Sequence, residues 1–166
     1  MPPILRIENL VKRYQAGRPA VLDGVSLELR AGEYVAIMGE SGVGKSTLLN
    51  LLAGLDRADA GRIEFDGVEV SALDDDAATL LRRQRMGFVF QAFHVLPYLT
   101  VAQNVAAARA ARRRQRGMGA RRGLLEAVGL GEFGERWPRE LSGGELQRVA
   151  IARALRTNRR CCSPTS

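Results

Sequence analysis

The sequence predicts an α/β fold with a mixed sheet in its core and a separate helix-rich lobe. Apolar and polar residues alternate over residues 4–14 and 25–29, as in half-buried strands. A glycine-rich turn joins a short apolar run at residues 33–38 to an apolar helical stretch at 47–53, which is typical of a buried strand followed by a helix. From about residue 99 to 138 helical patterns dominate, and we assign these residues to the lobe.

Local signals predict the remaining elements. Residues 63–70 are predicted as two short strands around the turn Asp66-Gly67. Residues 74–85 are predicted as a helix, because the first turn is acidic and the last turn is basic, as the helix dipole favours. A strand is expected at residues 87–90, and Thr100 with Gln103 forms the capping box of another helix. Together these elements form one domain with two lobes.

The glycine-rich turn has the spacing G-x-x-x-x-G-K-S, the pattern of a phosphate-binding loop, or P-loop. Its glycines let successive backbone N–H groups point at phosphate oxygens, and the following helix adds the positive end of its dipole. In this pattern Lys45 reaches the β- and γ-phosphates of a nucleotide, and the Ser46 hydroxyl ligates Mg²⁺. A chance match on a glycine-rich turn is the alternative, and the flanking strand and helix patterns argue against it. The predicted nucleotide-binding residues here are Gly39, Glu40, Ser41, Gly42, Val43, Gly44, Lys45, Ser46 and Thr47.

A second glycine pair opens another helix further along the chain. Ser142 and Glu145 have the spacing of a capping box. Between them, Gly143 and Gly144 leave the first helical turn without side chains, so that a phosphate could approach its N–H groups. An ordinary capped helix would explain the serine and the glutamate. It gives no reason for two glycines, which weaken a helix, so these four residues are a second candidate phosphate contact.

The two motifs together resemble the nucleotide-binding domain of ABC transporters, since residues 141–155 match the ABC signature motif and its helix almost residue by residue. The resemblance implies a P-loop NTPase fold with an ABC-type mixed sheet and a helical subdomain. It implies that ATP and Mg²⁺ are the cofactors. It also implies a head-to-tail dimer with a second nucleotide-binding domain, in which each signature serine contacts the γ-phosphate held by the other P-loop.

Two single residues gain a role only from this resemblance. Tyr14 matches the aromatic residue that stacks on adenine, whereas by itself it would be a surface tyrosine at a strand end. Gln91 matches the Q-loop glutamine, which contacts Mg²⁺ or the attacking water, and by itself it would be an unremarkable polar residue. The predicted catalytic residues are therefore Lys45 and Gln91, and the predicted Mg²⁺ ligands are Ser46 and Gln91. His94 does not lie where the family's switch histidine lies, so we expect it to be a surface or partner-groove residue.

The motifs are most similar to those of exporters of the lipoprotein-releasing and macrolide-efflux type. This resemblance implies an ATP-binding subunit that powers export or lipoprotein release while bound to transmembrane permease subunits. Residues 91–98 are expected to border the groove for a permease segment, with Phe93, Val95 and Leu96 as exposed apolar residues. One alternative is a soluble ABC ATPase acting on nucleic acid, although those usually carry tandem domains or long insertions. The other is a non-catalytic remnant, which an ATPase assay would separate from a working subunit.

Composition agrees with a folded domain. The chain has 166 residues, of which 46% are hydrophobic, so it can bury a core. No apolar run approaches the ~20 residues that span a bilayer, and no signal peptide is visible. We therefore expect a cytoplasmic protein, held at the inner face of the cell membrane by permease subunits.

The net charge of +7 comes almost entirely from arginine. Arginines cluster between residues 112 and 122, in the helical lobe. This cluster lacks the interleaved aromatic residues of proteins that bind single-stranded nucleic acid, so we interpret it as a solvated helical face and favour no nucleic-acid partner. The cluster consists of Arg112, Arg113, Arg114, Arg116, Arg121 and Arg122.

The last residues depart from the family pattern, in which a hydrophobic strand ending in Asp-Glu follows the signature helix. Here residues 159–166 read Arg-Arg-Cys-Cys-Ser-Pro-Thr-Ser, and adjacent cysteines rarely pair. GC-rich codons for this stretch, read in a shifted frame, give Pro-Leu-Leu-Leu-Ala-Asp-Glu. We therefore interpret residues 1–158 as the nucleotide-binding domain, incomplete at its C-terminus, and residues 159–166 as an aberrant, frameshifted tail. Without the acidic pair, the chain as given is expected to be inactive by itself.

Overall fold

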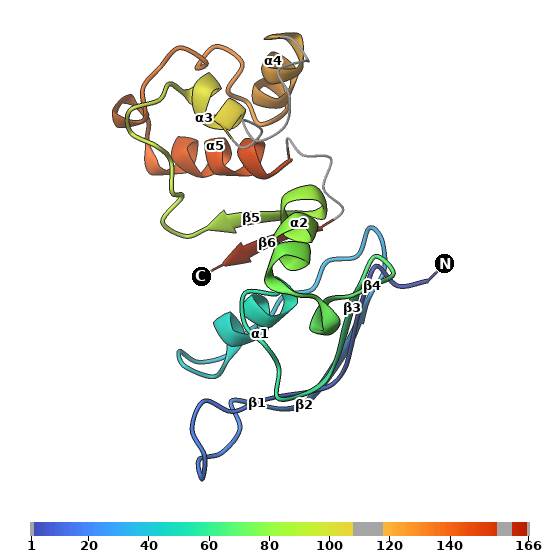
Figure 1. Ribbon diagram of the computed structural model, residues 1–166. Coiled ribbons are helices and arrows are strands. Elements are labelled where there is room, and N and C mark those ends of the chain that lie inside the picture. Colours follow the sequence, from blue (N-terminus) through green and yellow to red (C-terminus); the bar gives the residue numbers. More distant parts are fainter. Residues whose placement is uncertain (1, 108–117, 156–160, 166) are drawn as a thin grey trace. The chain divides into compact units, whose positions relative to one another are not determined.

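The structure is a computed structural model that describes residues 2–107, 118–155 and 161–165, with the backbone alone for 118–122 and 161–165. Two compact units form, Met1–Arg82 and Arg83–Ser166 (Figure 1). Within the described residues, no helix combines the length and the apolar composition needed to cross a membrane. The α/β fold that the sequence predicts is confirmed.

The first unit is built on an antiparallel sheet of four strands in the order β2-β1-β3-β4. Strand β1 pairs with β2 on one side and with β3 on the other, where Ile7 lies opposite Ile63. The strands expected at residues 4–14, 25–29 and 63–70 are confirmed, with shifted bounds. These bounds are Leu5–Lys12 for β1, Leu22–Leu29 for β2, Ala60–Phe65 for β3 and Val68–Glu69 for β4.

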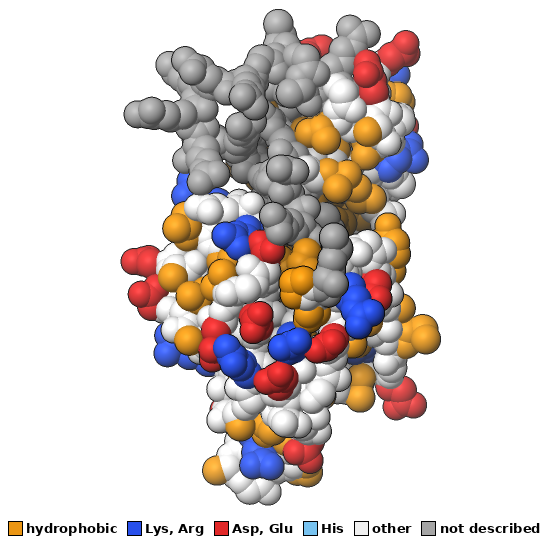
Figure 2. All heavy atoms as spheres, turned by 90° about the vertical axis from the view of Figure 1, so that its right-hand side faces the viewer, with side chains coloured by type: hydrophobic (Ala, Val, Ile, Leu, Met, Phe, Trp, Pro, Cys, Tyr) orange, Lys and Arg blue, Asp and Glu red, His pale blue; other side chains and the backbone are white. Residues whose placement is uncertain are grey.

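Alternation along these strands separates a buried face from a charged one. Ile7, Leu10 and Phe65 are buried almost completely. Charged side chains pair across the strands, for example Arg6 with Glu28 at 2.9 Å from Nε to the carboxylate oxygen. Such exposed pairs stabilise the fold by at most about 1 kcal/mol each. Figure 2 shows basic and acidic side chains interspersed over the surface that faces the viewer.

Helices α1 (Lys45–Leu52) and α2 (Asp75–Arg85) follow the predicted helical stretches closely, and a short 3-10 helix, η1 (Val70–Ala72), lies between them. Helix α1 buries Leu48 and Leu51. The guanidinium of Arg82 donates to the carbonyl oxygens of Ala53 and Gly54, at 3.1 and 2.7 Å, and so satisfies backbone acceptors at the end of α1.

The strand expected at residues 33–38 is wrong. The segment has no strand assignment, and Tyr34 and Met38 are 98% and 88% exposed. A strand forms only when a neighbouring strand accepts and donates its hydrogen bonds, and apolar side chains become buried only against another layer. Among the described residues, the sheet of the first unit contains only β1 to β4, so residues 33–38 have no strand beside them there.

In the second unit, strand β5 (Met86–Phe90) pairs in parallel with β6 (Cys161–Thr165), with Met86 opposite Cys161. The strand expected at 87–90 is confirmed. Part of the stretch interpreted as an aberrant tail therefore has strand geometry, and its origin in a frameshift stays a prediction. The helices are α3 (Val101–Ala107), α4 (Met118–Ala127) and α5 (Gly143–Leu155), with a 3-10 helix η2 at Pro138–Glu140.

A small apolar core holds these helices together. Thr100 and Gln103 form the expected capping box at the start of α3, where the Thr100 N–H donates to the Gln103 amide oxygen at 2.9 Å. The arginine cluster of residues 112–122 lies outside the residues whose side chains are described. The core residues are Val101, Val105, Leu125, Leu130, Val149 and Ala152.

Candidate functional site

The glycine-rich loop turns directly into α1, and three of its glycines have positive φ. These are Gly39 at 150°, Gly42 at 84° and Gly44 at 103°. Gly44 is the N-cap of α1, and a Cβ atom there would lie 2.9 Å from the Val21 carbonyl oxygen. Both the backbone conformation and the lack of space therefore require glycine at this position.

Lys45 lies across the loop that precedes it. Its ammonium group donates to the carbonyl oxygens of Gly39 and Glu40, at 2.9 and 2.7 Å. An ammonium has three N–H donors, so one remains for an incoming oxygen. The first turn of α1 contains no acidic residue, and the positive end of the helix dipole adds to the lysine charge. The loop and helix together form a site suited to an anion.

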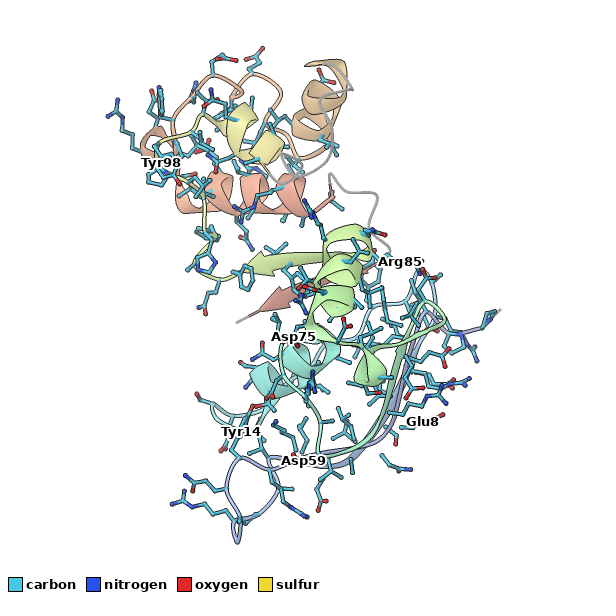
Figure 3. All side chains as sticks on the ribbon, in the orientation of Figure 1. Glu8, Tyr14, Asp59, Asp75, Arg85 and Tyr98 are labelled. Carbon is cyan, nitrogen blue, oxygen red and sulfur yellow. The ribbon has the colours of Figure 1, made fainter. Side chains whose placement is uncertain are left out.

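Tyr14 lies beside this loop, where Figure 3 shows it near the segment that leads into α1. Its hydroxyl oxygen is 3.4 Å from the Thr47 hydroxyl and 3.0 Å from a carboxylate oxygen of Asp56. The tyrosine is 58% exposed, and the Lys12 ammonium lies 5.0 Å from the centroid of its ring. The structure therefore brings Tyr14 to the first turn of α1, and its stacking on adenine stays a prediction.

The sequence reasoning missed Lys12 and Asp56. Lys12 is only 8% exposed, and its ammonium donates to Asp56 at 2.8 Å. One signal could have found it, because Lys12 continues the pattern of inward-facing residues along β1, where a lysine needs a partner. Nothing local indicates Asp56 as that partner, since 44 positions separate the two residues.

The start of α5 has the capping box that the sequence predicts. The Ser142 N–H donates to a Glu145 carboxylate oxygen at 2.6 Å, and the Glu145 N–H lies 3.4 Å from the Ser142 hydroxyl. The hydrogen bonds from the Ser142 backbone and hydroxyl lower the pKa of Glu145. A Cβ atom at Gly143 or Gly144 would meet no heavy atom within 4 Å. Internal packing therefore does not require these glycines, which leave the helix start open.

Gln91 follows β5 and is exposed. The turn after it is held by Arg153 of α5, which donates to the carbonyl oxygens of Phe93 and His94 at 2.8 and 2.6 Å. Both of these residues have positive φ, 56° and 45°. His94 is exposed, as expected, and its ring lies 4.9 Å from that of Phe90. The sequence placed Arg153 on the helix but did not reveal this contact.

The expectation that Phe93, Val95 and Leu96 are exposed is wrong, because all three are half-buried. Val95 packs against the core of the second unit. Tyr98 is the exposed large hydrophobic residue of this segment, at 68%. The predicted site residues thus fall into two groups: residues 39–47 with Tyr14 in the first unit, and Gln91 with residues 142–145 in the second.

A P-loop that opens one helix and a glycine pair that opens another define, in an α/β chain, an ATP-binding cassette. The family description "ABC transporter" matches residues 22–162, and the chain belongs to this family.

Two proteins with similar sequences are exporters by name. The macrolide export ATP-binding/permease protein MacB of Shigella flexneri is 47% identical over 160 residues, covering 93% of this chain and 24% of that protein. MacB of Escherichia coli strain K12 is 46% identical with the same coverage. The chain therefore spans about a quarter of the length of these curated relatives.

Two solved structures share the fold. One is a dimeric post-hydrolysis state of the ATP-binding cassette MJ0796 bound to ADP and Pi, with a TM-score of 0.82 and 38% identity. The matched region covers 96% of this chain and 72% of the MJ0796 chain. The other is CbiO1 from Clostridium perfringens, part of the ABC transporter complex cbiONQ, with a TM-score of 0.88 and 27% identity. The matched region covers 99% of this chain and 65% of the CbiO1 chain.

Proposed function

We propose that the chain binds Mg·ATP at its P-loop as the ATP-binding subunit of an ABC exporter. The observation that carries this proposal is the Lys45 ammonium, held over the loop by two backbone carbonyl oxygens at the start of a helix. Gly44 also supports a phosphate-binding turn, because a Cβ atom there would come too close to the Val21 carbonyl oxygen for this tight turn to form. When bound, ATP supplies the free energy for transport, and the loop supplies positioning and charge.

The residues also fit a magnesium ion. Mg²⁺ prefers oxygen ligands and usually keeps several waters beside substrate phosphates. Ser46 is exposed and directly follows Lys45, and its hydroxyl is an oxygen ligand of this kind. The amide oxygen of Gln91, which is also exposed, is a ligand of the same kind. Within the described residues, no cluster of three or more His, Cys, Asp and Glu could hold a metal ion. We propose that the Ser46 hydroxyl holds Mg²⁺ next to the phosphates, whereas Gln91, in the other unit, stays a ligand predicted from the family resemblance alone.

Replacing Ser46 with alanine is expected to weaken Mg·ATP binding about tenfold and to leave metal-free ATP binding unchanged. The hydroxyl acts only through the ion, whereas the loop N–H groups and Lys45 act on phosphate directly. Calorimetry with Mg²⁺ and with a chelator separates binding that depends on the ion from direct binding of the phosphates. Asn50→Ala, an exposed change on the same helix, is the matched control. If Ser46→Ala weakens both modes of binding equally, Ser46 is not a magnesium ligand.

We propose further that two such domains associate head to tail around two ATP molecules. In that dimer, the bare start of α5 at Gly143 and Gly144, capped by Ser142 and Glu145, would contact the γ-phosphate held by the partner. The open space around both glycines supports this proposal. The dimeric MJ0796 cassette bound to ADP and Pi supports it by similarity.

The partner we propose beyond the dimer is a transmembrane permease subunit, which would keep the protein at the cytoplasmic face of the membrane. Export is proposed from the similarity to MacB, and lipoprotein release is the alternative use of the same machinery. A soluble ABC ATPase acting on nucleic acid is the competing function.

Tyr98→Cys is expected to allow cross-linking to a membrane protein in cells, because Tyr98 is exposed at the end of the segment that follows Gln91. Leu80→Cys is the matched control, since Leu80 is an exposed apolar residue of α2. Mass spectrometry of the products identifies the partner. Capture of nucleic-acid-binding proteins alone would instead support the competing function.

We propose that the 166 residues by themselves bind ATP without turning it over. The residues after α5 contain no aspartate or glutamate, so they supply no carboxylate to activate water. If this proposal is correct, the isolated chain binds ATP in a binding assay and releases no phosphate above background.

A further inference from the structure

Tyr14 is oriented by polar contacts rather than by packing. More than half of the residue is exposed, so apolar contacts do not fix the angle of its ring. Its hydroxyl donates to an Asp56 carboxylate oxygen at 3.0 Å. The Thr47 hydroxyl lies 3.4 Å away, in the first turn of α1 and two residues after Lys45. The ring is therefore anchored at its hydroxyl end, next to the helix that begins at the P-loop.

Asp56 is itself held in place by several donors. One carboxylate oxygen accepts from the Lys12 ammonium at 2.8 Å and from the Arg57 N–H at 2.7 Å, while the other faces Tyr14. The same ammonium donates to the Arg57 carbonyl oxygen at 2.6 Å. The Lys12 side chain is 10% exposed and that of Asp56 is 30% exposed, so water reaches mainly the carboxylate, and the hydrogen bond between the two is charge-assisted. This hydrogen bond raises the pKa of Lys12 and lowers the pKa of Asp56.

A second carboxylate fixes the chain between Lys12 and Tyr14. The Arg13 N–H donates to Asp59 at 2.5 Å, from the loop that also carries Asp56. Figure 3 labels Asp59 in the same unit as Tyr14. The backbone of Arg13, just before the tyrosine, and the tyrosine hydroxyl are thus both attached to one short loop.

Lys12 also contacts the ring itself. Its ammonium lies over the Tyr14 ring, 5.0 Å from the centroid, a distance at which cation and π-system attract each other. The cation lies over one ring face, and the residue as a whole is 58% exposed, which leaves ring surface for a planar ligand. A cation draws electron density from the ring, which favours stacking with an electron-rich base.

We propose that Lys12 and Asp56 are positioning residues that hold the Tyr14 ring as a stacking platform for a purine base at a set distance from the P-loop. The inference rests on the proposed nucleotide site and assigns these two residues a task within it. In this proposal both residues act on the tyrosine and not on the phosphates. Their effect is therefore confined to ligands that carry a base.

The test compares Mg·ATP with inorganic tripolyphosphate, which offers phosphates without a base. Base–aromatic stacking predicts that Tyr14→Ala weakens ATP binding about tenfold or more. We expect Lys12→Met and Tyr14→Phe to weaken it about threefold to tenfold, because each keeps a ring but loosens its orientation. Tripolyphosphate binding should change less than about twofold in all three variants. Calorimetry on the full chain gives each dissociation constant.

A double variant excludes a merely structural role. In a Tyr14→Ala background, Lys12→Met should weaken ATP binding no further, because the platform that it orients is gone. An equal loss in both backgrounds overturns the proposal, as does an equal loss for tripolyphosphate. Tyr14→Phe keeps the Lys12–Asp56 pair intact, so it tests the anchor even if Lys12→Met fails to fold. Wild-type chain that binds neither probe would instead refute the P-loop proposal.

Discussion

Lys45→Ala should remove measurable Mg·ATP binding, with a loss of at least about 100-fold in affinity. Charge-assisted hydrogen bonds to an ionised group each contribute about 1.5–3 kcal/mol, and this ammonium is the cation held across the loop. Alanine would also free the carbonyl oxygens of Gly39 and Glu40, so the loop itself would lose two contacts. Isothermal calorimetry in the presence of Mg²⁺ measures the effect.

Two variants show whether the loss comes from this lysine or from charge in general. Arg18→Ala removes an exposed cation from the same unit and should leave affinity within about twofold. Lys45→Arg keeps the charge but replaces a compact ammonium by a planar fork, so we expect an intermediate loss. Phosphate release assayed in parallel should stay at background for every chain of these 166 residues. Unchanged affinity in Lys45→Ala would contradict the P-loop assignment.

Features that depend on a few neighbouring residues could be predicted from the sequence. The capping boxes of Thr100 with Gln103 and of Ser142 with Glu145 form as predicted, because each needs only residues three positions apart. The start of α1 at the P-loop is equally local, since Gly44 can take a backbone conformation that other residues avoid.

Features that depend on distant partners could not be predicted. Residues 33–38 have the composition of a buried strand, yet a strand needs a neighbour, and the described sheet of that unit provides none beside them. The Lys12–Asp56 pair and the contact of Arg153 with His94 join residues 44 and 59 positions apart. Patterns within the sequence say that Lys12 needs a partner, but only the fold says which one.

The segment after Gln91 depends on one buried polar residue, Asn104 of α3, which is 1% exposed. Its amide donates to the carbonyl oxygens of Leu96, Leu99 and Thr100, at 3.0, 2.9 and 3.1 Å. Its oxygen accepts from the Leu96 N–H at 2.7 Å. One side chain therefore contacts four backbone groups around residues 96–100, although the Leu96 and Thr100 carbonyl oxygens also accept from the backbone N–H groups of Leu99 and Asn104.

Asn104→Ala should lower the free energy of unfolding of the second unit by about 2–4 kcal/mol, because the part-buried Leu96 N–H and Leu99 carbonyl oxygen lose their hydrogen bonds to the side chain and a buried residue is truncated. Amide hydrogen exchange should show the loss first at Leu96, whose N–H donates to Asn104, while β1 of the first unit keeps its protection. Gln103→Ala is the matched control on the same helix, since it removes only the reciprocal cap and should cost about 1 kcal/mol. If both variants destabilise equally, or if exchange at Leu96 is unchanged, Asn104 does not organise this segment. The segment that follows Gln91 would then be held by the contacts of Arg153 with the carbonyl oxygens of Phe93 and His94.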